Sequence, residues 1–293
     1  MIPAVSATFR AEAFCGLSKA ELQELVRRAL AEDVGAEDLT TKLVVPPARA
    51  RGTFYAQRPL VISGLPVAEE VFRSLESQIR WEAFANEGAE VEEGGRLAGV
   101  EAQAATLLAG ERVALNFLQH LSGVATLTRE FAQRLWGLDT KLLDTRKTTP
   151  GLRALEKYAV RVGGGNNHRQ RLDDGILIKN NHLTLSGGVR AAVERARQAR
   201  SGRPTVEVEV RSVAELEEAI AAGADQVLLD NMTLDQAREC VQRAQGRLRL
   251  EVSGGIRLEN IRAYAESGVD SISVGALTHS APAMPIHFLV QAL

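Results

Sequence analysis

The chain has 293 residues, which at roughly 150 residues per domain predicts two domains or one large one. The composition, 45% hydrophobic and 25% charged, excludes a disordered chain, a coiled coil and a collagen-like repeat. The 35 Lys and Arg residues nearly balance the 37 Asp and Glu residues, and a net charge of −2 gives no overall field for nucleic acid or an anionic membrane. An anionic ligand must therefore be bound by a local cluster of cations.

The two cysteines, Cys15 and Cys240, lie far apart and match no disulfide or metal framework, so we expect a reducing compartment and a cytoplasmic protein. No uncharged apolar run reaches the ~18 residues of a membrane helix, and the N-terminus does not resemble a signal peptide. We expect nothing that targets or spans a membrane.

The first 135 or so residues predict mixed helices and strands without a regular rhythm. Ser18 and Glu21 form a capping-box pattern before an amphipathic helix that ends near Gly35. Short strands are expected at 51–57 and 60–62, and a second helix follows Gly64.

Glycines between residues 87 and 99 predict a small β-meander, and residues 104–136 predict a long helical region broken at Ser122-Gly123. A lipoyl or biotinyl carrier hairpin is an alternative interpretation of the meander. It is discounted because no lysine lies between Gly64 and Trp136.

After residue 138, short apolar strands alternate with helical stretches, which predicts βα repetition and a parallel sheet. The strands are expected at 141–145, 175–179, 205–210, 226–230, 248–252 and 271–274. The pattern predicts an α/β barrel, and because only six strands are visible we expect it to be incomplete. Polar residues follow the strands, and active sites of βα barrels lie at the carboxyl ends of the strands, so these residues should surround one pocket.

Cations are concentrated between Arg146 and Lys179, where eight Lys or Arg residues and His168 face only three acids. Lys179 directly follows an apolar strand, so it should point into the pocket. Thr149 is expected to cap a helix that begins at Pro150. The glycines at 163–165 offer a backbone that a ligand could approach closely, although by themselves they are weak evidence.

Carboxylates gather on two neighbouring strands. Glu207 and Glu209 lie two residues apart and share a face, so one should be at the opening and the other deeper. With Asp230 at the end of the next strand, they could hold Mg²⁺ or a sugar diol near phosphates. The loops containing Ser253, Gly254, Gly255 and Gly275 close the last two strands, where barrels of this kind often bind a phosphate.

Several ordered blocks resemble the quinolinate phosphoribosyltransferase family. They are Asp144-Thr-Arg-Lys-Thr-Thr-Pro-Gly-Leu-Arg153, Asn167-His-Arg169, Ile178-Lys-Asn-Asn-His182, Glu207-Val-Glu209-Val, Leu229-Asp-Asn231, Glu251-Val-Ser-Gly-Gly-Ile256, and, in the helical region, Glu111-Arg112, Leu115-Asn116 and Ser122-Gly-Val-Ala-Thr126. The similarity extends over nearly the whole chain.

The resemblance implies an N-terminal α/β sandwich packed on an incomplete α/β barrel. We place the sandwich at residues 1–120 and the barrel at 121–293, with the C-terminal tail returning to the N-terminal domain. It further implies a homodimer or a hexamer built as a trimer of dimers, in which Arg112 completes the partner's site.

The resemblance implies that Arg112, Arg146, His168 and Arg169 bind quinolinate. Lys147 and Lys179 would attend a substrate carboxylate or pyrophosphate, and Glu209 and Asp230 would face the ribose and its Mg²⁺. Ser253, Gly254, Gly255 and Gly275 would bind the 5-phosphate. Among these, Lys147, Lys179, Glu209 and Asp230 are the expected catalytic residues.

The implied reaction joins quinolinate to 5-phosphoribosyl 1-pyrophosphate (PRPP) and yields nicotinate mononucleotide, CO₂ and pyrophosphate for NAD synthesis. Two other acceptors stay open, nicotinate and the unknown anionic acceptor of a ModD-type relative. A binding or regulatory barrel without activity is less consistent, because it needs no carboxylate pair opposite a cation cluster.

Overall fold

The computed structural model describes residues 16–199 and 205–293, and the chain divides into two compact units. The first unit runs to residue 129 and also contains residues 149–164 and 280–293, while the second contains 130–148 and 165–279. The expected boundary at residue 120 lies inside α4 (Ala104–Arg134), which continues through it. Cys15 lies outside the described residues.

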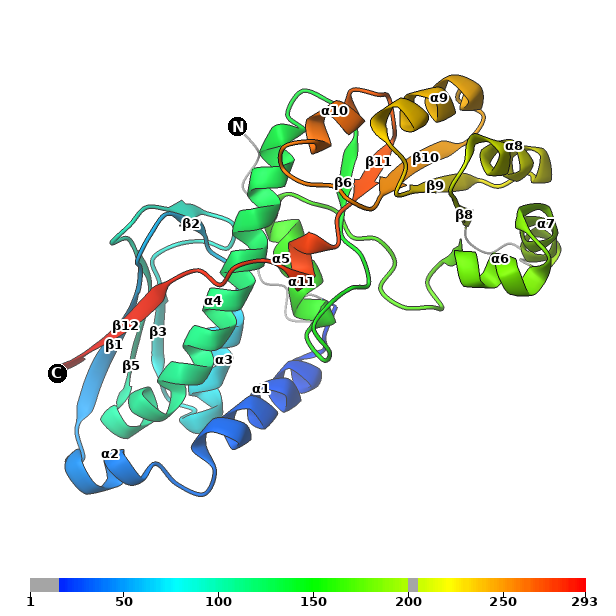
Figure 1. Cartoon of the computed structure of the whole chain (residues 1–293). Helices are drawn as coiled ribbons and strands as arrows, with labels where there is room; N and C mark the ends of the chain where they lie inside the picture. The colour runs from blue at the N-terminus through cyan, green and yellow to red at the C-terminus, as the bar shows by residue number, and fades with distance from the viewer. Residues whose placement is uncertain (1–15, 200–204) are drawn as a thin grey trace. The chain divides into compact units, whose positions relative to one another are not determined.

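The first unit is built on a four-stranded antiparallel sheet in the order β12-β1-β5-β3. Figure 1 shows β12, at the C-terminus, beside β1. The elements of this unit are α1 (Lys19–Val34), α2 (Leu39–Val44), β1 (Arg49–Ala56), β2 (Leu60–Val61), α3 (Leu65–Leu75), β3 (Arg80–Ala83), β4 (Glu90–Val91), β5 (Arg96–Gln103), most of α4, α5 (Arg153–Gly163) and β12 (Ile286–Ala292).

Aromatic packing connects the sheet of the first unit to its helices. The ring centroids of Phe54 on β1 and Phe288 on β12 lie 4.4 Å apart, and the Phe72 ring of α3 stacks on Phe288 at 5.9 Å. Phe54 and Phe72 are fully buried. The C-terminal strand is therefore part of the hydrophobic core of this unit.

Two sequence predictions about helices in the first unit are wrong. Helix α4 continues without a break through Ser122-Gly123. Gly123 is needed there because the backbone of Pro282 packs closely against the helix, and a Cβ at Gly123 would lie 2.2 Å from the Pro282 carbonyl oxygen. Helix α5 begins at Arg153 and not at Pro150. Thr149 accepts a backbone hydrogen bond from Leu152 and so forms a turn before the helix.

Three further features of the first unit differ from expectation or were not foreseen. The expected meander is split, because β4 pairs with β2 whereas β5 pairs with β1 and β3. Neither α2 nor β3 was predicted. The capping box at α1 is confirmed, since Ser18 Oγ accepts from the Glu21 N–H and Glu21 Oε2 accepts from the Ser18 N–H.

The second unit contains a six-stranded parallel sheet in the order β6-β11-β10-β9-β8-β7. Strand β6 pairs with β11 and β7 pairs with β8, so β6 and β7 end the sheet and the barrel is open between them. The six strands match the expected ones, and they are β6 (Lys141–Leu143), β7 (Ile176–Ile178), β8 (Val206–Val210), β9 (Gln226–Asp230), β10 (Arg249–Ser253) and β11 (Ser271–Ser273).

Helices of the second unit follow the strands, as Figure 1 shows for α8 and α9 beside the sheet. They are α6 (Asn180–Ser186), α7 (Val189–Ala199), α8 (Val213–Ala222), α9 (Leu234–Ala244), α10 (Ile261–Ala265) and α11 (Ala276–His279). Burial raises the pKa of the Cys240 thiol on α9 to about 11, so this cysteine is not a reactive thiolate. None of the described helices is both long and apolar enough to cross a membrane.

Candidate active site

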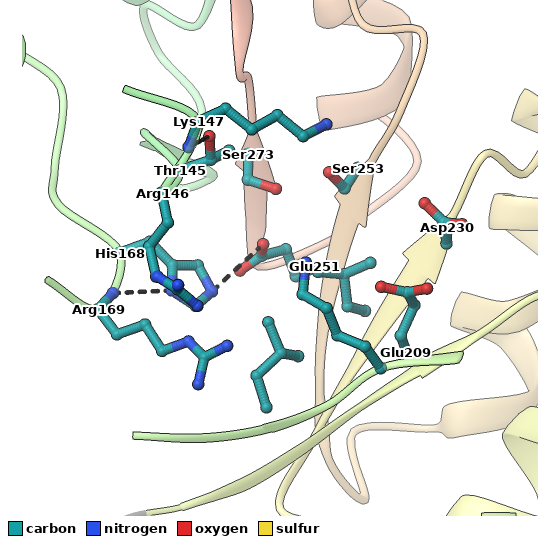
Figure 2. Close-up of a pocket in the computed structure, with 13 residues that line it drawn as sticks. Thr145, Arg146, Lys147, His168, Arg169, Glu209, Asp230, Glu251, Ser253 and Ser273 are labelled. Atoms are coloured by element: carbon teal, nitrogen blue, oxygen red, sulfur yellow. Dashed lines mark hydrogen bonds and ion pairs between the residues drawn. The ribbon is translucent and has the colours of Figure 1, made fainter. Parts of the chain in front are cut away.

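The carboxyl ends of the barrel strands surround a pocket of about 350 Å³, which lies entirely in the second unit. Figure 2 shows the labelled cations and His168 on one side and Glu209 and Asp230 on the other. The pocket is lined by Thr145, Arg146, Lys147, His168, Arg169, Leu177, Lys179, Glu209, Leu228, Asp230, Glu251, Ser253 and Ser273. All four expected catalytic residues are therefore brought together.

Arg146 and Lys147 follow β6 in a loop that other groups of the unit hold in place. The backbone N–H of Lys147 donates to Oγ1 of Thr145 at 3.0 Å, and Oγ1 of Thr278 donates to the Lys147 carbonyl at 2.7 Å. The Lys147 and Lys179 ammonium groups have no carboxylate partner in the described part of the chain. Their charge is available to an anionic ligand.

Arg169 lies close to Arg146, and this concentrates positive charge. Burial is the main cause that lowers the pKa of Arg169, and the nearby Arg146 charge adds to it. Nη1 of Arg169 donates to the Gly175 carbonyl at 2.9 Å, which orients the guanidinium group. Two guanidinium groups in one pocket are suited to bidentate recognition of carboxylates.

The opposite side of the pocket carries Glu209 on β8 and Asp230 at the end of β9. Within the described residues Glu209 makes no hydrogen bond or ion pair, which leaves its carboxylate available. Asp230 accepts from Asn231 Nδ2 at 3.0 Å and lies 3.7 Å from Nε of exposed Arg211. Glu209 is at the opening and Glu207 is deeper, as their spacing predicted.

Two buried carboxylates lie beside the His168 ring, and of these Glu251 lines the pocket. Glu207 Oε2 lies 3.3 Å and Glu251 Oε1 3.7 Å from His168 Nε2. Gln226 Nε2 donates to both carboxylates, at 2.9 Å to Glu207 and 3.3 Å to Glu251. Burial, followed by the charge of Glu207, raises the pKa of Glu251 to about 7.

Sequence reasoning missed Glu251 as a site residue, although a signal was present. In β10, Leu250 and Val252 face one side of the sheet, so Glu251 has to face the other. The same period of two places Gln226 and Glu207 on the inner face. Thr145, Ser273, Leu177 and Leu228 also line the pocket without having been singled out.

The loop after β10 needs glycine for reasons that the structure makes clear. Gly254 and Gly255 have φ angles of +91° and +65°, and a Cβ on Gly254 would lie 2.2 Å from Asn231 Oδ1. A Cβ on Gly275 would lie 3.1 Å from both the Lys147 side chain and His279 Nε2. Ser253, but none of these glycines, contributes to the pocket lining.

Other predicted residues lie elsewhere. Arg112 has an exposed side chain on α4 in the first unit. The expected cation cluster is smaller than its sequence suggests, because Arg153, Lys157 and Arg161 belong to α5 in the first unit. Gly163 and Gly164 end that helix and are not among the residues that line this pocket, and Gly164 is in the left-handed conformation at φ +99°.

Two groups of acidic residues differ in their suitability for Mg²⁺. Among the described residues, one group of three side chains could share a metal ion. It consists of His168, Glu207 and Glu251. An imidazole nitrogen in a closed site does not suit Mg²⁺, which prefers oxygen ligands and keeps several waters. Glu209 and Asp230 offer only oxygens at the open side of the pocket, and they fit Mg²⁺ better.

Comparisons with known proteins identify the family. A family model described as the N-terminal domain of quinolinate phosphoribosyl transferase matches residues 38–122, and that of its C-terminal domain matches residues 124–288. The chain belongs to the quinolinate phosphoribosyltransferase family. It is therefore an enzyme, a phosphoribosyltransferase of pyridine nucleotide biosynthesis.

Individual members of the family align over most of their length. The chain is 41% identical over 266 residues to the probable nicotinate-nucleotide pyrophosphorylase (carboxylating) of Bacillus subtilis, covering 91% of this chain and 92% of the relative. It is 43% identical over 267 residues to the Mycobacterium leprae enzyme, covering 88% and 93%. The nicotinate-nucleotide pyrophosphorylase structure from Francisella tularensis matches with a TM-score of 0.89 at 38% identity, covering 96% and 98%. The expected combination of N-terminal sandwich and incomplete barrel is confirmed.

Proposed function

We propose that the barrel pocket transfers the phosphoribosyl group of PRPP to the pyridine nitrogen of quinolinate, releasing pyrophosphate and CO₂ and forming nicotinate mononucleotide. The observation that supports this most directly is the opposition of cations and carboxylates across one pocket. Quinolinate carries two carboxylates, and PRPP carries a phosphate and a pyrophosphate. The substrates thus require several cations together, and the ribose hydroxyls require acceptors opposite them.

Quinolinate lies, in this proposal, on the side formed by Arg146 and Arg169. Their planar guanidinium groups match carboxylate geometry, whereas the compact ammonium groups of Lys147 and Lys179 suit pyrophosphate oxygens and the remaining carboxylate. Both lysines line the pocket without a carboxylate partner among the described residues. The pocket is thereby complementary to a dianionic ring.

The ribose of PRPP faces Glu209 and Asp230, and its 5-phosphate lies at Ser253, Gly254, Gly255 and Gly275. The positive φ angles of Gly254 and Gly255 leave the backbone without a side chain where a phosphate would approach. Mg²⁺, when bound near Glu209 and Asp230, supplies charge neutralisation for the pyrophosphate.

The chemistry needs positioning and electrostatics more than covalent catalysis. The nitrogen lone pair forms a bond to ribose C1 while the bond from C1 to pyrophosphate breaks, through a transition state with oxocarbenium character. Glu209 and Asp230 stabilise the positive charge that develops on the ribose, and Lys147 and Lys179 stabilise the negative charge of the departing pyrophosphate.

Loss of CO₂ then follows from the product of the first step. The C2 carboxylate leaves its bonding electrons on the ring carbon, where the positive ring nitrogen stabilises them. A proton then adds at C2 and yields the nicotinate ring. No group of the chain has to form a covalent intermediate.

The proposal includes a homodimer, or a hexamer made from such dimers, in the cytoplasm. Arg112 is exposed on α4 and is proposed to enter the pocket of the partner subunit. Mixing Arg112→Ala and Lys179→Ala subunits, each inactive alone, should restore roughly a quarter of the wild-type sites, because half of the random dimers contain one intact site. No recovery on mixing would contradict a shared site.

The function is tested with purified protein, PRPP and Mg²⁺, using quinolinate or nicotinate as the acceptor. Nicotinate mononucleotide and labelled CO₂ should form in equal amounts with quinolinate, and nothing should form with nicotinate. Reaction mixtures without PRPP provide the control for spontaneous decarboxylation. Product from nicotinate alone, or none from either acceptor, would refute the assigned reaction.

A further inference from the structure

The two ring nitrogens of His168 are both occupied within the protein. Nδ1 accepts a 2.8 Å hydrogen bond from the backbone N–H of Arg169, and Nε2 faces Glu207 and Glu251. A backbone N–H is always a donor, so Nδ1 has to be the unprotonated nitrogen. A ring that keeps this contact is neutral, with its single proton on Nε2.

The two carboxylates favour a proton on Nε2, because Glu207 Oε2 lies 3.3 Å and Glu251 Oε1 3.7 Å from that nitrogen. Glu251 is fully buried, and its Oε1, which points toward His168, accepts no hydrogen bond from any described residue. Oε2 of Glu251 accepts hydrogen bonds from Ser271 Oγ at 3.4 Å and from Gln226 Nε2 at 3.3 Å. Oε1 of Glu251 is thus directed at the ring, and Gln226 holds the two carboxylates side by side by donating to both.

Arg169 is the residue that gains from this arrangement. Its N–H is bound to the ring, its Nη1 to the Gly175 carbonyl, and the preceding backbone N–H, that of His168, to Asp144 Oδ1 at 2.8 Å. These contacts fix the Arg169 backbone and one edge of the guanidinium group. The other N–H groups of the guanidinium are left for a ligand.

We propose that His168 is a positioning residue, which acts as a neutral imidazole held by Glu207 and Glu251 and sets Arg169 for the substrate carboxylate. This inference rests on the proposed function, and it replaces the direct binding of quinolinate that the family resemblance implied for His168. An imidazolium that bound quinolinate directly would place a second N–H against the Arg169 N–H and would lose the contact to it. Glu251 is accordingly a second positioning residue, which acts through His168.

The variants His168→Asn and His168→Leu separate the two roles. Asn carries an oxygen near the place of Nδ1 and can still accept from the Arg169 N–H, whereas Leu fills similar space with no acceptor. We expect His168→Asn to keep the KM for quinolinate within about 5-fold of wild type, and His168→Leu to raise it by about 10- to 100-fold. The KM for PRPP should change little in both, and His287→Asn, on β12, provides the matched control.

The tautomer is measured directly by NMR on protein labelled with ¹⁵N-histidine. The chain contains five histidines, and the His168 signals are assigned as those that vanish in His168→Asn. We expect one protonated and one unprotonated nitrogen at neutral pH, in the free protein and with quinolinate added. Two protonated nitrogens in the quinolinate complex, or Asn as damaging as Leu in a variant that remains folded, would overturn the proposal.

The two levels of inference fail separately. Wild-type protein that does not turn over quinolinate refutes the proposed function, and the NMR result on free protein still decides the tautomer. Active wild type with a charged His168 refutes only the positioning role.

Discussion

The backbone N–H of His168 donates a 2.8 Å hydrogen bond to Oδ1 of Asp144, which directly follows β6. Asp144 is fully buried, and its Oδ2 accepts from the Asn167 side chain at 2.5 Å. One carboxylate thereby holds the segment that lies at the open edge of the barrel, between β6 and β7. The side of the pocket that is proposed to bind quinolinate therefore depends on the Asp144 carboxylate.

Replacing Asp144 with Asn should weaken this support. The Asn amide would present an N–H either to the His168 N–H or to the Asn167 side-chain amide, each of which now donates to a carboxylate oxygen. The lost hydrogen bond should lower the free energy of unfolding by about 1–3 kcal/mol. We expect a lower midpoint of urea unfolding and a KM for quinolinate raised several-fold, with the KM for PRPP nearly unchanged. Asp139→Asn, at an exposed position before β6, should change neither quantity.

Arg146→Ala should damage quinolinate binding most. Loss of a charged hydrogen-bond donor costs about 1.5–3 kcal/mol, so kcat/KM for quinolinate should fall by about 10- to 100-fold or more. Arg171→Ala removes an equal charge from an exposed residue outside the pocket and should leave kcat/KM near wild type. Normal quinolinate turnover by Arg146→Ala would contradict the assignment of the cationic side.

Asp230→Asn should change the dependence of the rate on Mg²⁺. The variant keeps the shape of Asp230 but loses the charge, so the Mg²⁺ concentration at half-maximal activity should rise about 10-fold. Asp235→Asn on α9 is the control, since the Asp235 side chain is 92% exposed and lies outside the pocket. Identical Mg²⁺ curves for Asp230→Asn and wild type would show that this carboxylate does not support the ion.

Glu251→Gln should change how stability depends on pH. Burial and the Glu207 charge raise the pKa of Glu251 from 4.5 to about 7. Between these values the folded protein keeps a proton that the unfolded chain releases, so stability falls as pH rises through this range, by up to about 3 kcal/mol.

In Glu251→Gln this contribution disappears, and the loss of urea stability between pH 5 and pH 7.5 should be smaller than in wild type. The exposed Glu259→Gln substitution is the matched control. An unchanged slope in Glu251→Gln would mean that Glu251 is ionised throughout, with the proton on another group of the cluster.

Gly123→Ala should destabilise the first unit. The added methyl group would lie 2.2 Å from the Pro282 carbonyl, which belongs to the backbone and cannot rotate away. Overpacking of this kind costs about 1–3 kcal/mol, and thermal unfolding should report it. Gln133→Ala, exposed on the same helix, should be neutral or slightly stabilising because alanine is the better helix former.

The regular part of the chain was the predictable part. Each barrel strand is a short apolar run between turn residues. The period of two placed Glu207 and Glu209 on one face, with one carboxylate at the opening and the other deeper. The same rule applied to β10 would have revealed Glu251. That residue was overlooked because an isolated acid in an apolar run does not show which neighbours it meets.

Tertiary packing decided the features that could not be read locally. Gly123 looks like a helix break in sequence, since the approach of Pro282 depends on residues far along the chain. The cations of α5 look like part of the anion site, because sequence distance does not show that this helix belongs to the other compact unit. The roles of the two His168 nitrogens depend on hydrogen bonds that no residue pattern encodes.

The gap between β6 and β7 has a consequence for how such a pocket can change during evolution. In a closed barrel every connection is constrained by the register of two paired strands. Here residues 165–175, which include His168 and Arg169, lie at the open edge between β6 and β7. Their only described strand-like pairing is one bridge between Leu143 and Asn166. Insertions or exchanges in this stretch can alter acceptor preference while the strands that bear Glu209, Asp230 and Ser253 stay in place. A relative that transfers the same sugar to a different ring is expected to differ first in these eleven positions.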